Sequence, residues 1–281
     1  MNKTALVTGA SSGLGLATAQ LLATRGYDVY GTTRTQKPAD VPGVHMLTLE
    51  LARADSVAAC VQSVLDRAGR IDLLVNNAGF PQAGAIEETS LEEIEHEFQV
   101  NFFGALRVIK RVIPQLRAQG GGRIVNVSSA AAFIPVPYYG IYGASKAALE
   151  RMTFSLRQEL RPFGIEVAIV SPSSHRTNVQ WTLPAAPLSA YQIPRERMLS
   201  AMRQTVVEGG DPNDVARAIL VAATAKHPKA RYPVGGDAKA FALVQRLVPH
   251  GVIERMIQAK FQLGLGATAA LPAGSRPRER H

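Results

Sequence analysis

Short apolar runs alternate with helix-like segments over residues 3–171, and this alternation constrains the fold more than any other feature of the chain. Runs typical of buried strands lie at 3–8, 27–33, 45–51, 71–75, 123–128 and 165–171. Helical patterns occupy 14–25, 55–68, 90–118 and 142–163. Parallel strands need helical crossovers between them, so this order predicts an α/β fold. We expect a doubly wound parallel sheet of about seven strands, with helices on both faces, in a single domain.

Local signals predict where some of these elements begin and end. Ser90 with Glu93 three residues later has the pattern of a capping box, so a helix should start there and break near residues 102–104. Residues 232–235 suit a short edge strand. Pro249 should interrupt the last helical stretch, because proline removes a helix hydrogen bond and clashes with the preceding turn.

The chain beyond residue 172 departs from the regular alternation. Its first part carries Trp181, several prolines and few charges, so we expect a mobile apolar lid over about residues 178–210. We place the folded domain at residues 1–264. Residues 265–281 are rich in Ala, Pro, Gly and Arg, a composition that predicts a disordered basic tail.

Composition favours a globular protein that works in a reducing compartment. Apolar residues make up 46% of the 281 residues and charged residues 19%, which is ample for a core. Cys60 is the single cysteine, so an internal disulfide is excluded. The N-terminus lacks the pattern of a signal peptide, and no apolar stretch approaches the length of a membrane span. We therefore expect a cytoplasmic protein.

The positive charge is concentrated at the C-terminal end. The chain has a net charge of +9, and residues 191–281 hold 14 Lys/Arg against 7 Asp/Glu. This region could face an acidic lipid surface or nucleic acid, attract a polyanionic cofactor, or simply be solvated. No recognition motif for nucleic acid accompanies it, so we expect no such partner. Peripheral membrane contact by the amphipathic C-terminus stays open.

A glycine-rich turn joins the first predicted strand to the first helix. Its spacing is Gly9-x-x-x-Gly13-x-Gly15, which permits a tight turn and close approach of the backbone to a phosphate. The helix that follows offers free N–H groups and a partial positive charge to a pyrophosphate. A tight turn without a ligand is the alternative, but its place between strand and helix favours a nucleotide.

Tyr142 and Lys146 lie four residues apart on a helical segment and so share one face. An ammonium group near a phenol favours the phenolate, which would lower the pKa of Tyr142 from about 10 toward neutrality. Such a phenol can exchange a proton with a carbonyl or an alcohol. The spacing also occurs where a lysine merely packs beside a half-buried ring.

Taken together, these motifs resemble those of the short-chain dehydrogenases/reductases, and the resemblance covers about residues 3–263. The family's T-G-x-x-x-G-x-G stands at residues 8–15, its N-N-A-G at 76–79, and its Y-x-x-x-K at Tyr142 and Lys146. Asn101 matches its helix asparagine and Ser128 its serine. The resemblance implies a Rossmann-like fold, a nicotinamide cofactor and hydride transfer to or from a carbonyl or alcohol carbon.

The resemblance also implies a role for each matching residue. Tyr142 would be the general acid/base, and Lys146 would lower its pKa and bind the nicotinamide ribose. Ser128 would donate a hydrogen bond to the substrate oxygen, and Asn101 would hold a water that relays protons. The cofactor-binding residues would be Gly9, Ser11, Ser12, Gly13, Leu14, Gly15, Arg34, Glu50, Leu51, Asn77, Ala78, Gly79, Tyr142, Lys146, Pro172, His175 and Thr177. No histidine spacing suggests a metal, and none is needed.

The end of the second strand predicts the cofactor type. Thr33 stands where an aspartate would hold the 2′-hydroxyl of NAD, and Arg34 follows with a guanidinium suited to a 2′-phosphate. We therefore expect NADP(H) rather than NAD(H). Glu50 replaces the family's aspartate beside the adenine.

Ser173 departs from the family pattern, which has glycine directly after the proline at Pro172. If this position needs a positive φ, serine would strain the turn. The family also has a threonine after this proline that reaches the nicotinamide carboxamide, and Thr177 matches it.

The predicted substrate wall is apolar. It consists of Phe80, Pro81, residues 130–141 and Trp181, which suits a hydrophobic ketone, aldehyde or secondary alcohol, and residues 231–261 resemble the steroid- and retinoid-handling members. The same side chains could instead pack a loop core. Family members commonly pair through two helices, here 105–118 and 142–163, so we expect a homodimer or homotetramer. The alternative function is a catalytically silent NADP-binding scaffold, which the full set of catalytic residues disfavours.

Overall fold

Seven parallel strands form one sheet within the described residues, which are 2–35, 40–244, 248 and 250–261 of a computed structural model. The spatial order is β3-β2-β1-β4-β5-β6-β7, and every neighbouring pair is parallel. The strands are β1 (Thr4–Val7), β2 (Asp28–Thr33), β3 (Val44–Thr48), β4 (Leu73–Asn76), β5 (Gly122–Val127), β6 (Ile165–Pro172) and β7 (Arg231–Val234). The doubly wound α/β prediction is confirmed, and the short strand β7 lies at the edge as expected.

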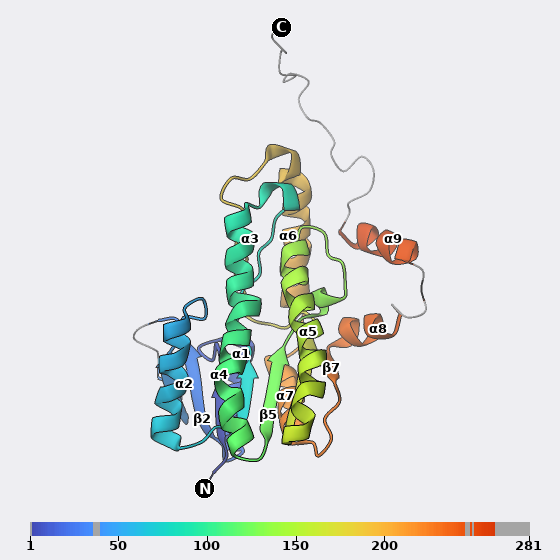
Figure 1. Ribbon diagram of the computed structural model, residues 1–281. Coiled ribbons are helices and arrows are strands. Elements are labelled where there is room, and N and C mark those ends of the chain that lie inside the picture. The colour runs from blue at the N-terminus through green and yellow to red at the C-terminus, as the bar shows by residue number, and fades with distance from the viewer. Residues whose placement is uncertain (1, 36–39, 245–247, 249, 262–281) are drawn as a thin grey trace, which may run out of the picture.

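Helices cover both faces of the sheet (Figure 1). On one face lie α2 (Ala54–Ala68), α4 (Ala105–Ala118) and α5 (Gly140–Leu160), and on the other α1 (Gly13–Thr24) and α7 (Pro212–Thr224). The chain winds outward from β1 to β3 and then returns to β4 on the other side of β1. The strand order therefore reverses between β1 and β4, and doubly wound sheets bind ligands at the carboxyl ends of such a pair.

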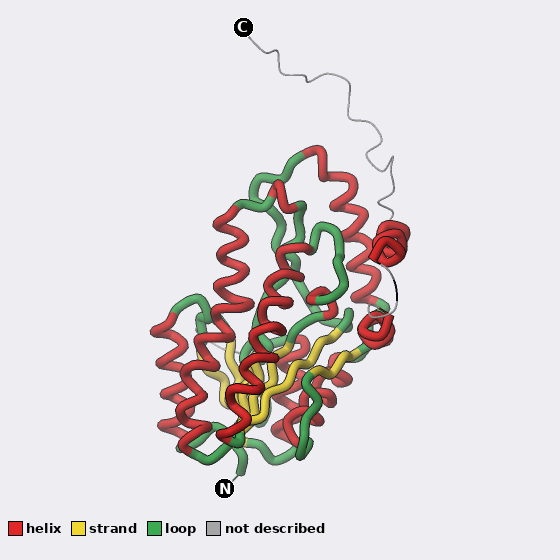
Figure 2. The backbone as a smooth tube through the Cα atoms, turned by 45° about the vertical axis from the view of Figure 1, so that its right-hand side comes forward, coloured by secondary structure: helices red, strands yellow, loops and turns green. Residues whose placement is uncertain are grey.

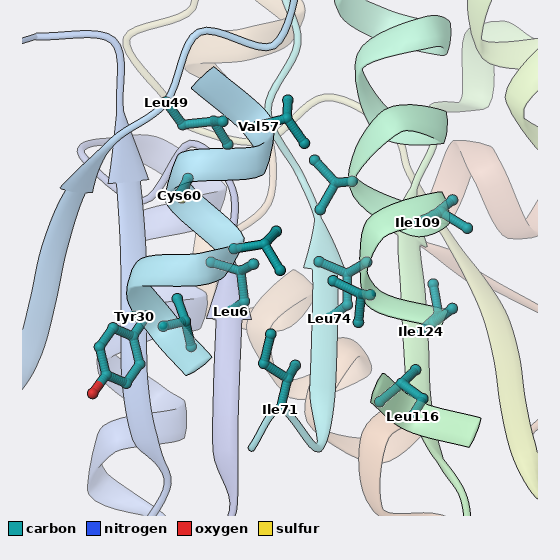
Figure 3. Close-up of a cluster of buried hydrophobic side chains, with 14 of the residues drawn as sticks. Leu6, Tyr30, Leu49, Val57, Cys60, Ile71, Leu74, Ile109, Leu116 and Ile124 are labelled. Atoms are coloured by element: carbon teal, nitrogen blue, oxygen red, sulfur yellow. The ribbon is translucent and has the colours of Figure 1, made fainter. Parts of the chain in front are cut away.

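Two apolar layers hold the helices to the sheet. Under α2 and α4, Leu6, Leu74 and Ile124 lie in a buried cluster shown in Figure 3. The opposite layer, under α1 and α7, includes Val125 and Ile219. Each fully buried aliphatic side chain stabilises the fold by about 1.5–3 kcal/mol, so the two layers fix the strand ends from which the site is built.

The helix that precedes α4 changes its winding at the sheet's upper edge. Helix α3 (Leu91–Phe98) begins at Ser90, whose hydroxyl accepts from Glu93 N while the Glu93 carboxylate accepts from Ser90 N, which confirms the predicted capping box. Residues Gln99–Gly104 then form a π-helix before α4 starts. The predicted break near residues 102–104 is thus a widened turn that leaves the rod continuous.

A second layer of chain stands above the carboxyl ends of the strands, as the tube in Figure 2 shows. It contains α6 (Gln192–Val207), α8 (Gly236–Val244) and α9 (His250–Phe261). The described residues also form 3-10 turns at Ile86–Glu88, Ala130–Ala132, Arg161–Phe163 and Ser189–Tyr191. A buried ion pair between Arg195 and Glu88 ties α6 to the loop before α3. The predicted lid at 178–210 is therefore an ordered, partly helical segment; its mobility stays a prediction.

The C-terminal predictions are tested only in part. Separate helices α8 and α9 lie on either side of Pro249, which itself lies outside the described residues, as do residues 262–281 with the predicted tail. Across the described part of the chain, the helices are all too short or too polar to cross a bilayer.

Candidate active site

A cavity of about 760 Å³ opens at the carboxyl ends of the strands, beside the reversal between β1 and β4. All seventeen residues that the sequence predicted to bind the cofactor line this cavity. Ser128 also reaches its wall, whereas Asn101 lies behind it. The fold thus gathers predicted residues from distant parts of the chain into one space.

The glycine turn after β1 forms one end of the cavity and fits a dinucleotide. Gly9 and Gly13 have φ of 68° and 54°, which favours glycine. A Cβ at Gly15 would lie 2.0 Å from Gly9 O, so the turn closes only without a side chain there. Ser12 caps α1 without a side-chain hydrogen bond, and the first-turn N–H groups of this helix face a ligand site.

Asn77 locks the glycine turn to the end of β4. Its side-chain amide donates to Thr8 O at 3.0 Å and to Gly9 O at 3.1 Å, and its backbone N–H donates to Thr8 Oγ1 at 3.0 Å. Asn77 lines the cavity as well. Asn77 therefore braces two strand ends and also forms part of the cavity wall.

The end of β2 carries an exposed cation over the cavity. Arg34 directly follows Thr33, the last residue of β2, and both line the cavity. Glu50 lies on the opposite side of this corner, where its carboxylate accepts from Ala52 N at 3.3 Å. The guanidinium and the carboxylate together make this corner suitable for the adenosine part of a dinucleotide.

The segment after β6 does not show the strain expected at Ser173. Tyr138 is the one non-glycine residue with positive φ in the described parts of the chain, so Ser173 has an ordinary backbone. The Ser173 side chain fits because residue 235 is a glycine with φ of 97°. A Cβ at Gly235 would stand 2.0 Å from Ser173 Oγ. The condition for strain, a positive φ at Ser173, is therefore not met, and Gly235 on the neighbouring strand end leaves room for the serine side chain.

His175 and Thr177 take different positions along this segment. The buried ring of His175 uses Nδ1–H to donate to Ser173 O at 2.9 Å. Thr177 lies beside the glycine turn, where a Cβ on Gly13 would come within 3.4 Å of Thr177 Cγ2. Thr177 therefore closes the phosphate end of the cavity.

The serine that interacts with the Tyr142 phenol is Ser129, the neighbour of Ser128, to which the resemblance assigns a hydrogen bond to the substrate oxygen. A side-chain hydrogen bond with Ser129 lowers the pKa of Tyr142. Ser128 is buried, and its Oγ has no hydrogen-bond partner among the described residues. Ser129 has extended backbone, with φ of −155° and ψ of 156°, so neighbouring side chains point in opposite directions. Only one of Ser128 and Ser129 can therefore face Tyr142. The alternation of side-chain direction along an extended segment is the signal that could have separated the two serines.

Burial, rather than Lys146, dominates the ionisation of Tyr142. One side of the ring faces the cavity, yet desolvation raises the pKa of Tyr142 to about 12, while Ser129 opposes that rise. Lys146 Nζ lies 5.9 Å from the Tyr142 ring centroid and donates to Val127 O at 3.1 Å. The expectation that Lys146 brings the phenol near neutrality is therefore not met by the protein groups alone. Burial also lowers the pKa of Lys146 to about 8.

Asn101 clamps the chain that follows β4. Its Oδ1 accepts from Phe80 N at 3.0 Å, and its Nδ2 donates to Phe80 O at 2.9 Å. It sits in the π-helix at Gln99–Gly104. Nδ2 also lies 3.2 Å from Glu97, a buried carboxylate that the sequence analysis missed because a glutamate on a helix is ordinarily solvated.

The other end of the cavity is apolar. The predicted wall residues Phe80, Pro81 and Trp181 line it, and Tyr139 packs against Tyr142 with ring centroids 4.7 Å apart. The C-terminal helices add further apolar side chains: Phe241, Met256, Ile257 and Phe261. A pocket of this kind accepts a largely hydrophobic ligand.

A family model described as short chain dehydrogenase matches residues 3–187, well over half of the chain. The chain belongs to the short-chain dehydrogenase family. The motifs at the glycine turn and at Tyr142 both fall within the matched residues.

The relatives of this short-chain dehydrogenase agree with that assignment. It is 37% identical over 277 residues to the uncharacterized oxidoreductase YusZ of Bacillus subtilis, covering 92% of this chain and 98% of the relative. It is 36% identical over 235 residues to the 3-ketodihydrosphingosine reductase of Bacteroides thetaiotaomicron, covering 82% and 87%. A crystal structure of a short-chain dehydrogenase from Streptomyces avermitilis matches with a TM-score of 0.79 at 33% identity, covering 94% and 97%.

Family membership fixes the class of chemistry. Short-chain dehydrogenases use a nicotinamide cofactor, NAD or NADP, and this member is an oxidoreductase that acts on CH–OH and C=O groups. The glycine turn, the corner at Arg34 and the wall around Tyr142 form one continuous cavity, as such a cofactor requires.

Proposed function

We propose that this short-chain dehydrogenase transfers hydride between NADP(H) and an apolar ketone, aldehyde or secondary alcohol, with Tyr142 as general acid/base. One observation carries the proposal: the Tyr142 phenol, hydrogen-bonded to Ser129, stands where the dinucleotide end and the apolar end of the cavity meet. A bound nicotinamide would supply or accept the hydride. The residues of the chain then have only proton and charge chemistry to perform.

In the reducing direction, Tyr142 donates its proton to the substrate oxygen, which gains negative charge as the carbonyl is reduced. A phenol whose pKa is raised to about 12 holds that proton until the oxygen needs it. Ser129 donates a hydrogen bond to the same oxygen and stabilises its developing charge. Ser129 thus takes the role that the sequence analysis gave to Ser128. In the oxidising direction the deprotonated Tyr142 accepts the proton of the alcohol, and Ser129 keeps its hydrogen bond to the same oxygen.

The preference for NADP(H) is supported by Arg34. Its side chain is exposed at the end of β2 and lines the cavity, and Thr33 beside it offers no carboxylate for a ribose 2′-hydroxyl. A guanidinium can form two parallel hydrogen bonds with a 2′-phosphate. A 2′-hydroxyl offers neither the negative charge nor the second acceptor oxygen for this pairing.

A long apolar substrate is supported by the length of the wall. Apolar residues continue from Tyr139 to Ile257 and Phe261 on α9. The similar protein from Bacteroides thetaiotaomicron is a 3-ketodihydrosphingosine reductase. We propose a ketone or alcohol with a long hydrocarbon chain, and steroid- and retinoid-like carbonyls are the nearest alternatives. Assembly into a homodimer or homotetramer through α4 and α5 stays a prediction.

The test is NADPH oxidation against a panel of apolar carbonyls, with NADH in parallel. The panel contains 3-ketodihydrosphingosine, steroid ketones, retinal and medium-chain aldehydes. We expect turnover with at least one apolar carbonyl, and the Tyr142→Phe variant should bind NADPH normally yet lose turnover about 10²–10⁴-fold. Full activity in Tyr142→Phe would remove the tyrosine from its role. NADPH binding without turnover on any carbonyl would favour a silent binding protein.

A further inference from the structure

Glu97 is a carboxylate enclosed by protein one helical turn before Asn101. The residue is 0% exposed, and its Oε1 accepts from Gln82 N and from Asn101 Nδ2, each at 3.2 Å. Within the part of the chain that the structure describes, its Oε2 has no hydrogen-bond partner. Burying a carboxylate costs free energy unless a charge or donor compensates, and a glutamine would accept the same two hydrogen bonds. The acidic group therefore needs a reason beyond packing.

A contiguous chain of contacts leads from Glu97 to the catalytic lysine. Asn101 Nδ2, which lies 3.2 Å from Glu97, also lies 3.2 Å from the hydroxyl of Ser145, the neighbour of Lys146. A Cβ at Gly79 would stand 2.8 Å from Asn101 Oδ1 and 3.3 Å from Lys146 Nζ. The Asn101 amide and the Lys146 ammonium therefore both lie beside Gly79. The Glu97 carboxylate lies next to the Asn101 amide.

The charged and titratable groups around Glu97 come mainly from α5 and the loop before it. Lys146 faces it as a cation, and Tyr142 and Tyr139 as neutral phenols. Glu150, one turn beyond Lys146, is a second carboxylate acting on the lysine. On α3 itself, His96 stacks on Phe80, with ring centroids 5.4 Å apart.

The electrostatic directions agree with this geometry. Burial raises the pKa of Glu97 to about 7, and Lys146 opposes that rise. Burial lowers the pKa of Lys146 to about 8, and Glu97 is the largest influence in the opposite direction. Near pH 7.5 the carboxylate and the ammonium stabilise each other's charged forms, whereas below pH 6 Glu97 is mostly neutral and this attraction is lost.

We propose that Glu97 is a positioning residue whose buried carboxylate keeps Lys146 protonated and, through Asn101, holds the backbone at Gly79 against that lysine. Its effect on catalysis rests on the proposed function. The interaction between Glu97 and Lys146 does not, because it exists in the protein without substrate.

A double-mutant cycle tests the interaction without turnover. Full-length wild type, Glu97→Gln, Lys146→Met and the double variant are unfolded in urea at pH 7.5 and at pH 5.5. We expect the unfolding equilibrium constants to be non-additive by about fivefold or more at pH 7.5 and additive at pH 5.5. Additivity at both pH values would overturn the proposal. If Glu97→Gln does not fold, Glu97→Met supplies the neutral arm of the cycle.

A pH profile tests the consequence for catalysis. The carboxylate raises the pKa values of both Lys146 and Tyr142, so Glu97→Gln should shift the basic limb of the kcat/KM profile to lower pH, by about half a unit or more. Glu97→Asp keeps the charge and should retain the wild-type profile. Glu95→Gln removes an exposed carboxylate from the same helix and should change nothing.

Each result has one meaning. An unshifted profile in Glu97→Gln, or a profile shifted equally in Glu97→Asp, would make Glu97 a packing residue and refute the proposal. Absence of turnover by wild type on every carbonyl would defeat the proposed function, while the urea cycle would still decide whether Glu97 and Lys146 interact.

Discussion

The two ends of the cavity are built by different means. The phosphate end consists of backbone: Gly9, Gly13 and Gly15 shape a turn that few other residues could form, and Asn77 braces it with three hydrogen bonds. The catalytic end consists of side chains from β5, α5 and the lid that meet only in the folded protein. The first is set by local sequence, and the second by tertiary packing.

This difference explains which expectations were accurate. Backbone geometry restricts residue type strongly, so a glycine pattern can be interpreted from the sequence alone. A hydroxyl or carboxylate at the catalytic end depends on which way a side chain points and on how much solvent its neighbours exclude. A sequence motif gives neither the direction of a side chain nor its burial.

The strongest test compares the two serines after β5. Ser129→Ala should lower kcat about 10²–10³-fold, because it removes the hydrogen-bond donor beside the Tyr142 phenol. Ser128→Ala should change kcat less than about threefold, since its hydroxyl has no partner to lose. Steady-state kinetics on the best carbonyl measures both. The reverse ranking would restore Ser128 to the role first expected for it.

Arg34 tests the dinucleotide end. Arg34→Asp should weaken NADPH binding about 10–100-fold while changing NADH binding much less, because a carboxylate repels a 2′-phosphate and can bind a 2′-hydroxyl. Fluorescence titration of both cofactors gives the ratio. Arg25→Asp, an exposed change of equal charge beyond the end of α1, is the control. A cofactor ratio that moves equally in both variants would indicate a general charge effect.

Lys146 provides the smallest effect, a change in the pH dependence of stability. Its folded pKa, about 8, lies below its ordinary 10.5, so the folded state loses its proton before the unfolded state does. The buried charge of Lys146 therefore lowers the free energy of unfolding below pH 8, and this loss of stability declines as the pH rises toward 10.5. Urea unfolding of wild type and Lys146→Met should show a stability difference that shifts by about 1–2 kcal/mol between pH 7 and pH 9. A stability difference that is the same at pH 7 and pH 9 would mean that Lys146 has an ordinary pKa and is solvated in the folded protein.

Most of the fold could be predicted because its signals are repetitive. The alternation of strands and helices predicted the parallel sheet, and Ser90 with Glu93 located the start of α3. Strand and helix limits differ from the predicted ones by only a few residues, as at β3, which ends at Thr48 rather than residue 51. The extra winding at Gln99–Gly104 was visible only as a break, because no residue pattern identifies a π-turn.

The catalytic end was predicted in composition but not in detail. The sequence identified Tyr142, Lys146 and Asn101, yet it could not show that burial outweighs the lysine's influence on the phenol. Nor could it separate Ser128 from Ser129, since the choice depends on backbone direction after β5. Ser173 shows the same limit, because the space it needs is made by Gly235, more than sixty residues away.

The π-helix at Gln99–Gly104 has a consequence for how the protein tolerates change in length. A π-turn is an α-helix with one residue in excess, and each residue of an α-helix turns the chain by about 100°. The wide turn absorbs this extra residue, so α3 and α4 keep the phase of one regular helix on either side of it. Deleting one residue there would close the wide turn and redirect the side chains within it, Asn101 among them, while Glu97 on α3 would keep its direction. The excess residue thus sets the direction of Asn101 without setting the direction of the helices that flank it.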